Sequence, residues 1–206
     1  MVKKDADRAN AQDERDRPIR SDARRNVDAL LQAAMTAFVE SGVDAPMRMI
    51  AAKAGVGVGT IYRHFPQRSD LIKAIIRREV DACVEAAATL KTAQKPDQAL
   101  ALWLEGLVDF VSTKRGLGPA LHSGDPAYQS LPDYVLGQLV PALSGLLDAA
   151  AAAGAVRSDI DAGEVLLAAL RLATPAADGD TAQARRMMAL LVDGLRFGAK
   201  TPPPPR

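Results

Sequence analysis

Four side chains that carry hydrogen-bond donors lie within five residues of one another. This segment holds Thr60, Tyr62, Arg63 and His64, which supply hydroxyl, guanidinium and imidazole groups. Such groups bind phosphate oxygens and the polar edges of bases, whereas catalysis needs an activated nucleophile or a matched acid and base. The chemistry that the segment offers is therefore binding to nucleic acid.

The other reactive residues do not form the pattern of a catalytic or metal site. The chain has two histidines, His64 and His122, and one cysteine, Cys83. A structural zinc site needs four such ligands, and an internal disulfide needs two cysteines. Gly55, Gly57 and Gly59 superficially resemble a dinucleotide-binding loop, but they follow a helical segment and not a strand. We predict no metal, no cofactor and no enzymatic activity.

The composition predicts an all-α fold of about nine helices. Hydrophobic residues make up 48% of the chain and aromatic residues only 4%, and much of the apolar content is Ala and Leu, which are strong helix formers. The first twenty residues lack the apolar core of a signal peptide. The sequence shows no run of about 18 apolar residues, which is the length needed to cross a membrane. We therefore expect a cytoplasmic protein that does not bind membranes.

The donor-bearing segment lies on the second of two short predicted helices. An apolar stripe from Val27 to Val39 predicts a first helix over about residues 22–41, ended by Gly42. Two short helices follow, over about residues 46–54 and 58–65, and a turn with two glycines joins them. This is the arrangement of a helix-turn-helix, in which the second helix enters the major groove of DNA.

At this level of detail the sequence resembles a known family. Residues 50–65, IAAKAGVGVGTIYRHF, resemble the signature of the tetracycline-repressor (TetR) family of transcriptional regulators, and the likeness extends over about residues 24–80. The stretch from Lys114 to Leu117 resembles a subgroup common in high-GC bacteria. The resemblance implies an all-helical homodimer, with a small DNA-binding domain and a larger ligand-binding and dimerisation domain.

The resemblance also implies roles for individual residues of the helix-turn-helix. Phosphate contacts are implied for Thr60, Tyr62, His64 and Arg68, base contacts for Val58, Gly59 and Arg63, and a guanine contact for Arg48. Two positions depart from the family pattern. Ala45 precedes Pro46 where a capping Thr is common, unless Asp44 substitutes, and Gly57 replaces a Ser or Thr. We expect the loss of the first cap to cost about 1 kcal/mol.

Charge and composition divide the chain into four parts. We predict a mobile polar arm over residues 1–22, a DNA-binding domain over 23–68, a ligand-binding and dimerisation domain over 69–200, and a disordered tail over 201–206. Residues 1–80 hold 15 Lys and Arg against 11 Asp and Glu, whereas residues 81–206 hold 11 against 14. Arg20 near the end of the arm, and Arg24 and Arg25 directly after it, fit two interpretations, namely contacts to DNA or solubilising charge.

Helical spacing in the larger domain places two further sets of residues. Pro141 interrupts the apolar helix that starts near Pro132, so we expect a kink or a break there, beside a cavity. The candidate cavity residues are Trp103, Leu107, Phe110, Val111, His122, Tyr134 and Leu139. For Trp103 alone, a place in the solid core is the favoured interpretation and cavity lining the alternative. The candidate dimer residues, on the two last helices, are Leu166, Leu170, Met187, Leu191 and Leu195.

Together these features predict a sequence-specific DNA-binding regulator. The leading hypothesis is a repressor that binds a palindromic double-stranded operator as a homodimer and is released by a small hydrophobic effector. The alternative is an effector-independent activator or an architectural DNA-binding protein, whose DNA affinity would not respond to any metabolite.

Overall fold

The computed structural model describes residues 26–121, 123–175 and 180–197. Within these ranges the chain forms nine α-helices and two short 3-10 turns, with no strand, so the predicted all-α fold is confirmed. The predicted arm, the predicted tail and His122 lie outside the described residues. The chain divides into two compact units, Met1–Leu71 and Ile72–Arg206, a division three residues from the boundary that the sequence suggests.

The first unit contains the first helix, of which residues 26–41 are described, and two short helices, α2 (Met47–Ala54) and α3 (Val58–His64). The first helix ends as expected at Gly42, whose φ of +77° is the left-handed conformation that favours glycine. The core of the unit is apolar, and Phe38, Ile50 and Ile61 are among its fully buried side chains.

The long helix α4 (Arg68–Ala93) begins in the first unit and continues into the second. The remaining elements of the second unit are α5 (Pro96–Ser112), η1 (Arg115–Leu117), α6 (Gly118–Leu121), η2 (Pro126–Tyr128), α7 (Leu131–Ala152), α8 (Ala162–Leu172) and α9 (Ala182–Phe197).

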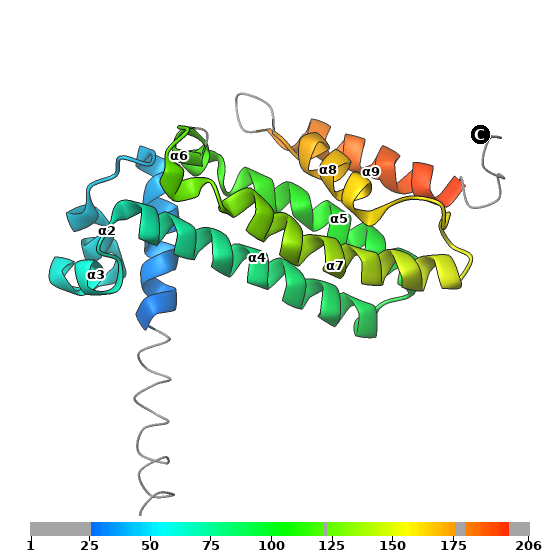
Figure 1. Cartoon of the computed structure of the whole chain (residues 1–206), viewed down its shortest axis with the longest axis horizontal. Helices are drawn as coiled ribbons and strands as arrows, with labels where there is room; N and C mark the ends of the chain where they lie inside the picture. The colour runs from blue at the N-terminus through cyan, green and yellow to red at the C-terminus, as the bar shows by residue number, and fades with distance from the viewer. Residues whose placement is uncertain (1–25, 122, 176–179, 198–206) are drawn as a thin grey trace, which may run out of the picture. The chain divides into compact units, whose positions relative to one another are not determined.

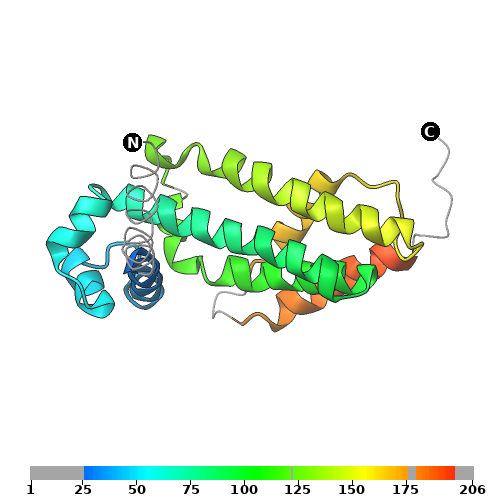
Figure 2. The same cartoon turned by 90° about the horizontal axis from the view of Figure 1, so that it is seen from below.

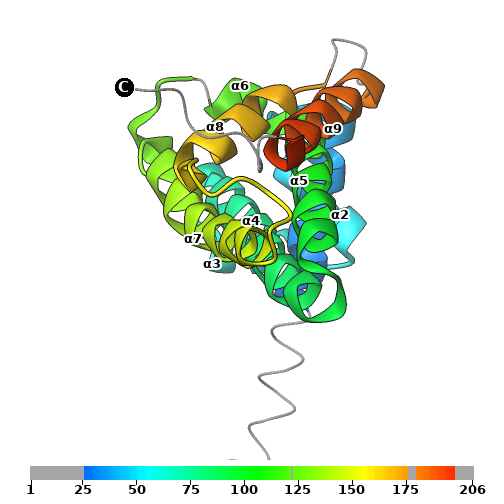
Figure 3. The ribbon, with the colours of Figure 1, turned by 90° about the vertical axis from the view of Figure 1, so that its right-hand side faces the viewer.

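In the second unit α5 packs against α7, α8 and α9, and α7 also packs against α8 (Figure 1). The end view of Figure 3 shows α8 and α9 on one side of this group. In Figure 2 the helix α4 runs alongside α5 and α7. The core between these helices is built from leucines, with Leu104, Leu107, Leu139 and Leu143 fully buried.

Aspartate side chains bind backbone amides at the starts of α8 and α9. The Asp161 carboxylate accepts a hydrogen bond from the Glu164 amide at 3.0 Å, which caps α8. Before α9 the Asp180 carboxylate accepts a hydrogen bond from the Ala182 amide at 2.8 Å. The helix α7 is continuous through Pro141, so the expected break is absent. Pro141 lies on the exposed side of the helix, where water can bind the backbone carbonyl that loses its partner to the proline.

One segment is longer and more apolar than the sequence reading allowed. Pro126–Ala152, which includes α7, reaches the length and hydropathy of a membrane-crossing helix by composition alone. In the fold, α7 packs against α5 and α8 and buries Leu139, Leu143 and Leu146 in the core of the second unit. The buried leucines therefore account for part of its apolar character, since 28% of the apolar window is buried.

Candidate DNA-binding surface and ligand cavity

A glycine turn sets the angle between α2 and α3. Gly55 has a φ of +67°, and the amides of Gly55 and Val56 return to the carbonyls of Ala52 and Ala51 at 3.2 and 3.0 Å. These bonds satisfy carbonyls that α2 leaves free at its end, and the left-handed residue reverses the chain at once. The sequence Gly-Val-Gly thus folds as the tight turn that a helix-turn-helix needs (Figure 1).

The two faces of α3 are chemically different. Its inner face buries Ile61, and Phe65 directly after the helix is also buried. Its outer face exposes the side chains of Val58, Tyr62, Arg63 and His64, with Tyr62 at 50% exposure. Gly59 is exposed as well, so the backbone of the helix is open to close approach. The outer face therefore presents the predicted donors to solvent on one short helix.

Thr60 and Arg48, two further predicted DNA contacts, differ in their exposure to solvent. Thr60 is half-buried and lines a space of about 160 Å³ inside the first unit, together with Val27, Leu30 and His64 among others. Arg48 is exposed on α2. The predicted phosphate contacts of Thr60 and the predicted guanine contact of Arg48 remain predictions, which the geometry permits.

Arg68 has a structural role that the sequence did not reveal. Its Nη1 donates to the carbonyls of Val43 and Ala45 at 2.6 and 2.7 Å. These carbonyls lie just before α2, where no side chain caps the helix, so Asp44 does not replace the missing Thr. The helix α3 also lacks a side-chain cap, as expected from Gly57. Arg68 therefore fixes the start of α2, and a phosphate contact would use its other nitrogens.

The second unit holds an apolar cavity of about 460 Å³. Its walls come from α4, α5, α6, η2, α7 and α8, and α7 is the helix with Pro141 beside which we expected a cavity. The lining consists of Ile76, Phe110, Lys114, Leu121, Tyr128, Leu131, Pro132, Val135, Leu136, Leu167 and Leu170. A space of this size and character is typical of small-molecule sites.

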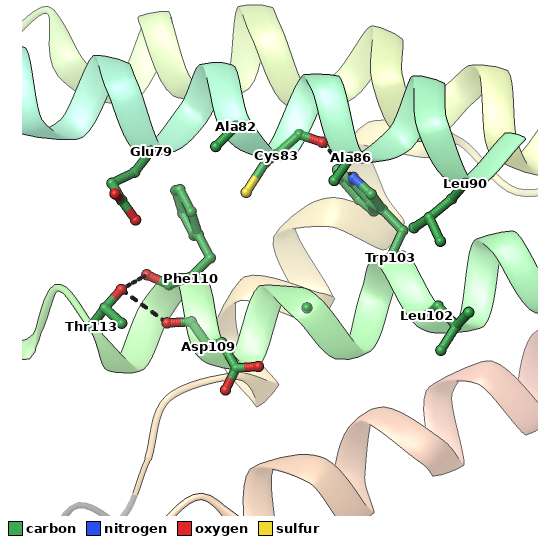
Figure 4. A pocket seen from close by; sticks show the side chains of 11 residues that line it. Glu79, Ala82, Cys83, Ala86, Leu90, Leu102, Trp103, Asp109, Phe110 and Thr113 are labelled. Carbon is green, nitrogen blue, oxygen red and sulfur yellow. Dashed lines mark hydrogen bonds between the residues drawn. The ribbon is translucent and has the colours of Figure 1, made fainter. Parts of the chain in front are cut away.

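A smaller cavity of about 250 Å³ lies between α4 and α5 (Figure 4). Glu79 and Cys83 extend into it from α4, and Phe110 and Trp103 from α5. The Trp103 indole nitrogen donates to the Cys83 carbonyl at 2.8 Å, which fixes the ring. Phe110 lines both cavities, so its ring belongs to the wall between them.

Some of the predicted cavity residues line a cavity, and others do not. Phe110 lines both spaces and Trp103 the smaller one, whereas Leu107 and Leu139 are fully buried core. Tyr134 lines neither cavity, and its hydroxyl donates to the Asp81 carboxylate at 3.2 Å. Val111 is half-buried and lines neither cavity. The α7 wall is made by Leu131, Pro132, Val135 and Leu136, and not by the predicted Tyr134 and Leu139.

Lys114 is the residue of this region that sequence reasoning missed. Its side chain is only 8% exposed, and its Nζ donates to the Phe110 carbonyl at 2.6 Å and lies 3.6 Å from the Glu79 carboxylate. The same nitrogen lies 3.4 Å from the centre of the Phe110 ring. The available signal was spacing, because Lys114 continues the apolar stripe of Trp103 and Leu107 at positions i+11 and i+7.

Comparisons with known proteins agree with this geometry. A family described as bacterial regulatory proteins of the tetR family matches residues 30–75, and the C-terminal domain of SbtR-like transcriptional regulators matches residues 95–197. A solved TetR transcriptional regulator from Streptomyces coelicolor is 38% identical, with a TM-score of 0.69 over 82% of this chain and 98% of that one. The chain belongs to the TetR family.

Two other relatives of this TetR-family chain extend the comparison. A TetR regulatory protein from Mycobacterium vanbaalenii is 33% identical, with a TM-score of 0.70 over 87% of this chain and 99% of that one. An HTH-type transcriptional regulator from Staphylococcus aureus strain USA300 is 29% identical over 109 residues. That match covers 52% of this chain and 59% of the relative, which is less than two-thirds of the relative's length.

The apolar helices at the carboxy-terminal end of this TetR-family chain use some predicted dimer residues for its own core. Leu166 and Leu195 are buried within the chain, whereas Leu170, Met187 and Leu191 are partly exposed. The most exposed large apolar side chains on α8 and α9 are Leu167, Leu190 and Phe197. The burial of Leu166 and Leu195 leaves Leu170, Met187 and Leu191 as the predicted residues that a second copy could reach, beside these exposed side chains.

The buried Lys114 of this TetR-family chain predicts an unusual dependence of stability on pH. Burial lowers the pKa of its ammonium from 10.5 to about 8, and Glu79 opposes this only in part. Burial raises the pKa of the Cys83 thiol from 9.0 to about 11. Between pH 8 and 9 the folded chain loses the Lys114 proton that the unfolded chain keeps, and this outweighs the partial loss of the Cys83 proton from the unfolded chain, so the unfolded chain binds more protons. The free energy of unfolding therefore rises by about 1 kcal/mol.

Above pH 9 the unfolded chain also loses the Cys83 proton that the folded chain keeps, so the two effects cancel and the rise stops. Urea unfolding of the wild type and of Lys114→Met at pH 7.5, 8, 9 and 10 measures this. The variant is expected to show no rise between pH 8 and 9. An equal rise in the variant would assign the effect to another group.

Proposed function

We propose that this protein is a cytoplasmic transcriptional repressor that binds a palindromic operator as a homodimer and is released by a small hydrophobic effector. The observation that supports this most directly is the outer face of α3, where Tyr62, Arg63 and His64 are exposed beside an open backbone at Gly59. Membership of the TetR family supports DNA recognition by this face.

In this proposal the donors of α3 divide their work between phosphates and bases. Hydroxyl and imidazole groups at Tyr62 and His64 bind phosphate oxygens, which fixes the position of the helix but carries no sequence information. The Arg63 guanidinium reaches a base edge, where its two parallel donors match the acceptors of guanine. The two DNA-binding domains of a dimer can bind together only where the half-sites lie about 34–36 Å apart along the DNA.

The cavity of the second unit supplies the response to a ligand. Ile76 of the cavity wall belongs to α4, the same helix that begins with Arg68 beside α2. A ligand that shifts α4 therefore acts on the helix that fixes the start of α2. The coupling is reciprocal, because a ligand that weakens operator binding must itself be weakened equally by the operator.

Filling the cavity separates DNA binding from the response. Leu136 lines the larger cavity, so Leu136→Trp is expected to bind the operator like the wild type while losing its response to effector. The operator is first obtained by selection from random duplex DNA. Its affinity is then measured by fluorescence anisotropy, with and without an organic extract of the native host's culture.

The same change in the smaller cavity, Leu102→Trp, is the matched control and is expected to keep the response. Release of wild-type protein by the extract, absent in Leu136→Trp and present in Leu102→Trp, is the expected pattern. If the extract leaves the operator affinity of all three proteins unchanged, the effector-independent alternative is favoured over a releasable repressor.

A further inference from the structure

Among the described residues that line the larger cavity, one is charged. Ten of these eleven residues are uncharged, and apart from the Tyr128 phenol they are wholly apolar. The exception is Lys114, which stands on the same wall as Phe110. Apolar sites usually orient a ligand through a small number of well-placed polar groups. Here the single charged group has a positive sign, and this decides which ligands fit.

The Lys114 ammonium has donor capacity left for a ligand. It has three N–H groups, and the Phe110 carbonyl accepts one of them at 2.6 Å. The Glu79 carboxylate lies 3.6 Å away, which is longer than a direct charged hydrogen bond of about 2.7–2.9 Å. The Phe110 ring covers another side of the nitrogen as a cation–π contact. The contact to Glu79 is the longest of the three, so an incoming oxygen can take its place on the ammonium and leave the two Phe110 contacts intact.

The charge of Lys114 is also incompletely compensated by the protein. Burial lowers the pKa of the ammonium to about 8 in spite of the nearby Glu79 carboxylate, so the charged form is less stable here than in water. An anion beside the nitrogen would replace the lost solvation. A cation would add a second positive charge in a low-dielectric space, which is unfavourable.

The size of the available charge restricts the anion further. One ammonium is a point charge with three donors, unlike the forked guanidinium groups that hold doubly charged phosphates at two points. The walls on the other side of the cavity are the aliphatic side chains of Leu131, Val135 and Leu136. A singly charged head with an uncharged, apolar body fits both features.

We propose that the larger cavity binds an apolar monocarboxylate, with its carboxylate on Lys114 Nζ and its apolar body against Leu131, Val135 and Leu136. The proposal rests on the proposed function in taking this cavity as the effector site. It adds the chemical class of the effector and the residue that selects it.

The test compares ligands that differ only in charge. The probes are decanoate with decanamide, and 2-naphthylacetate with 2-naphthylacetamide. Binding to the full-length protein without DNA is measured by calorimetry and by the emission of Trp103, the single tryptophan of the chain. We expect at least one carboxylate to bind the wild type about tenfold or more tightly than its amide, which is about 1.4 kcal/mol.

Three variants test whether Lys114 and the larger cavity are responsible for the preference for the carboxylate over the amide. Lys114→Met keeps an apolar stem of similar length and is expected to bind carboxylate and amide equally, at the affinity of the amide. Lys95→Met removes a charge from an exposed lysine outside the cavity and is expected to keep the full preference. Leu136→Trp fills the cavity and is expected to lose binding of both ligands. Helical content and melting temperature show whether each variant is folded.

Equal binding of the carboxylate and amide by the wild type would overturn the proposal, as would the absence of binding by all four probes. A folded Lys114→Met that keeps the preference would overturn it too. If Lys114→Met does not fold, the wild-type comparison and Leu136→Trp decide.

Operator affinity is measured separately. Carboxylate binding through Lys114 that leaves the operator affinity unchanged would contradict release by an effector but not this inference. Release of the operator by uncharged compounds alone would contradict this inference and leave the repressor function standing.

Discussion

Leu190→Asp is expected to leave the protein monomeric and to lower its affinity for an operator with two half-sites by roughly a hundredfold or more. On α9 the residues Met187, Leu190, Gly194 and Phe197 recur at spacings of three and four, and all are partly or fully exposed. Leu190 is 62% exposed and Phe197 83%. Such an apolar stripe with a glycine is suited to close packing against a second copy.

The expected loss has two physical causes. An aspartate at Leu190 would be an unpaired charge within an apolar interface, which costs several kcal/mol to desolvate. A monomer then binds one half-site and loses the gain from linking two heads, which is about 10² to 10⁴ in affinity. Because Leu190 is exposed in the single chain, the substitution should leave the monomer fold intact.

Sedimentation velocity gives the oligomeric state and anisotropy gives the operator affinity. Ala189→Asp, at an exposed position outside the stripe, is the control and is expected to remain dimeric with wild-type affinity. A folded Leu190→Asp that sediments as a dimer at the wild-type concentration would show that this stripe is not the interface.

Arg63→Ala is expected to remove the preference for one base pair in each half-site, at a cost of about 1–3 kcal/mol in discrimination. The Arg63 side chain is exposed on α3, so its loss takes away a base-reading group without disturbing the core of the first unit. The measurement is the affinity for the selected operator and for versions with each single base-pair change in both half-sites.

Tyr62→Phe is the matched comparison for Arg63→Ala. It removes one exposed hydroxyl and leaves the ring in place, so it is expected to weaken binding to all operator versions alike, by about 0.5–1.5 kcal/mol. If Arg63→Ala retains the full pattern of base preferences, Arg63 contacts only the backbone and another α3 residue reads the bases.

Much of the fold was predictable because local rules determine it. Apolar spacing located the helices, and Gly42 and Gly55 have the left-handed conformations expected at helix ends. The exposed face of α3 was also predictable, because Ile61 and Phe65 fix which side is buried. In these cases one residue type answers one local geometric need, and no long-range information is required.

The cavity could not be predicted to the same degree. Periodicity identifies buried residues, but it gives the same signal for Leu107, which packs solidly, and for Phe110, which borders empty space. The two hydrogen bonds from Arg68 to the carbonyls of Val43 and Ala45 join segments more than twenty residues apart in the sequence. Leu166 and Leu195 look like interface residues by their apolar neighbours, but the packing of α5, α8 and α9 buries them in one chain.

In the proposed ligand site, the Phe110 ring would limit the size of the ligand, because Phe110 borders both cavities. The two spaces that it borders have volumes of about 250 and 460 Å³. Rotation, or replacement by a smaller residue, would join them into one elongated chamber that reaches from Lys114 to Trp103. A change in one codon could thus extend the accepted molecules from short to long while the charged end of the chamber stayed the same. Selectivity for length and selectivity for charge would then evolve independently.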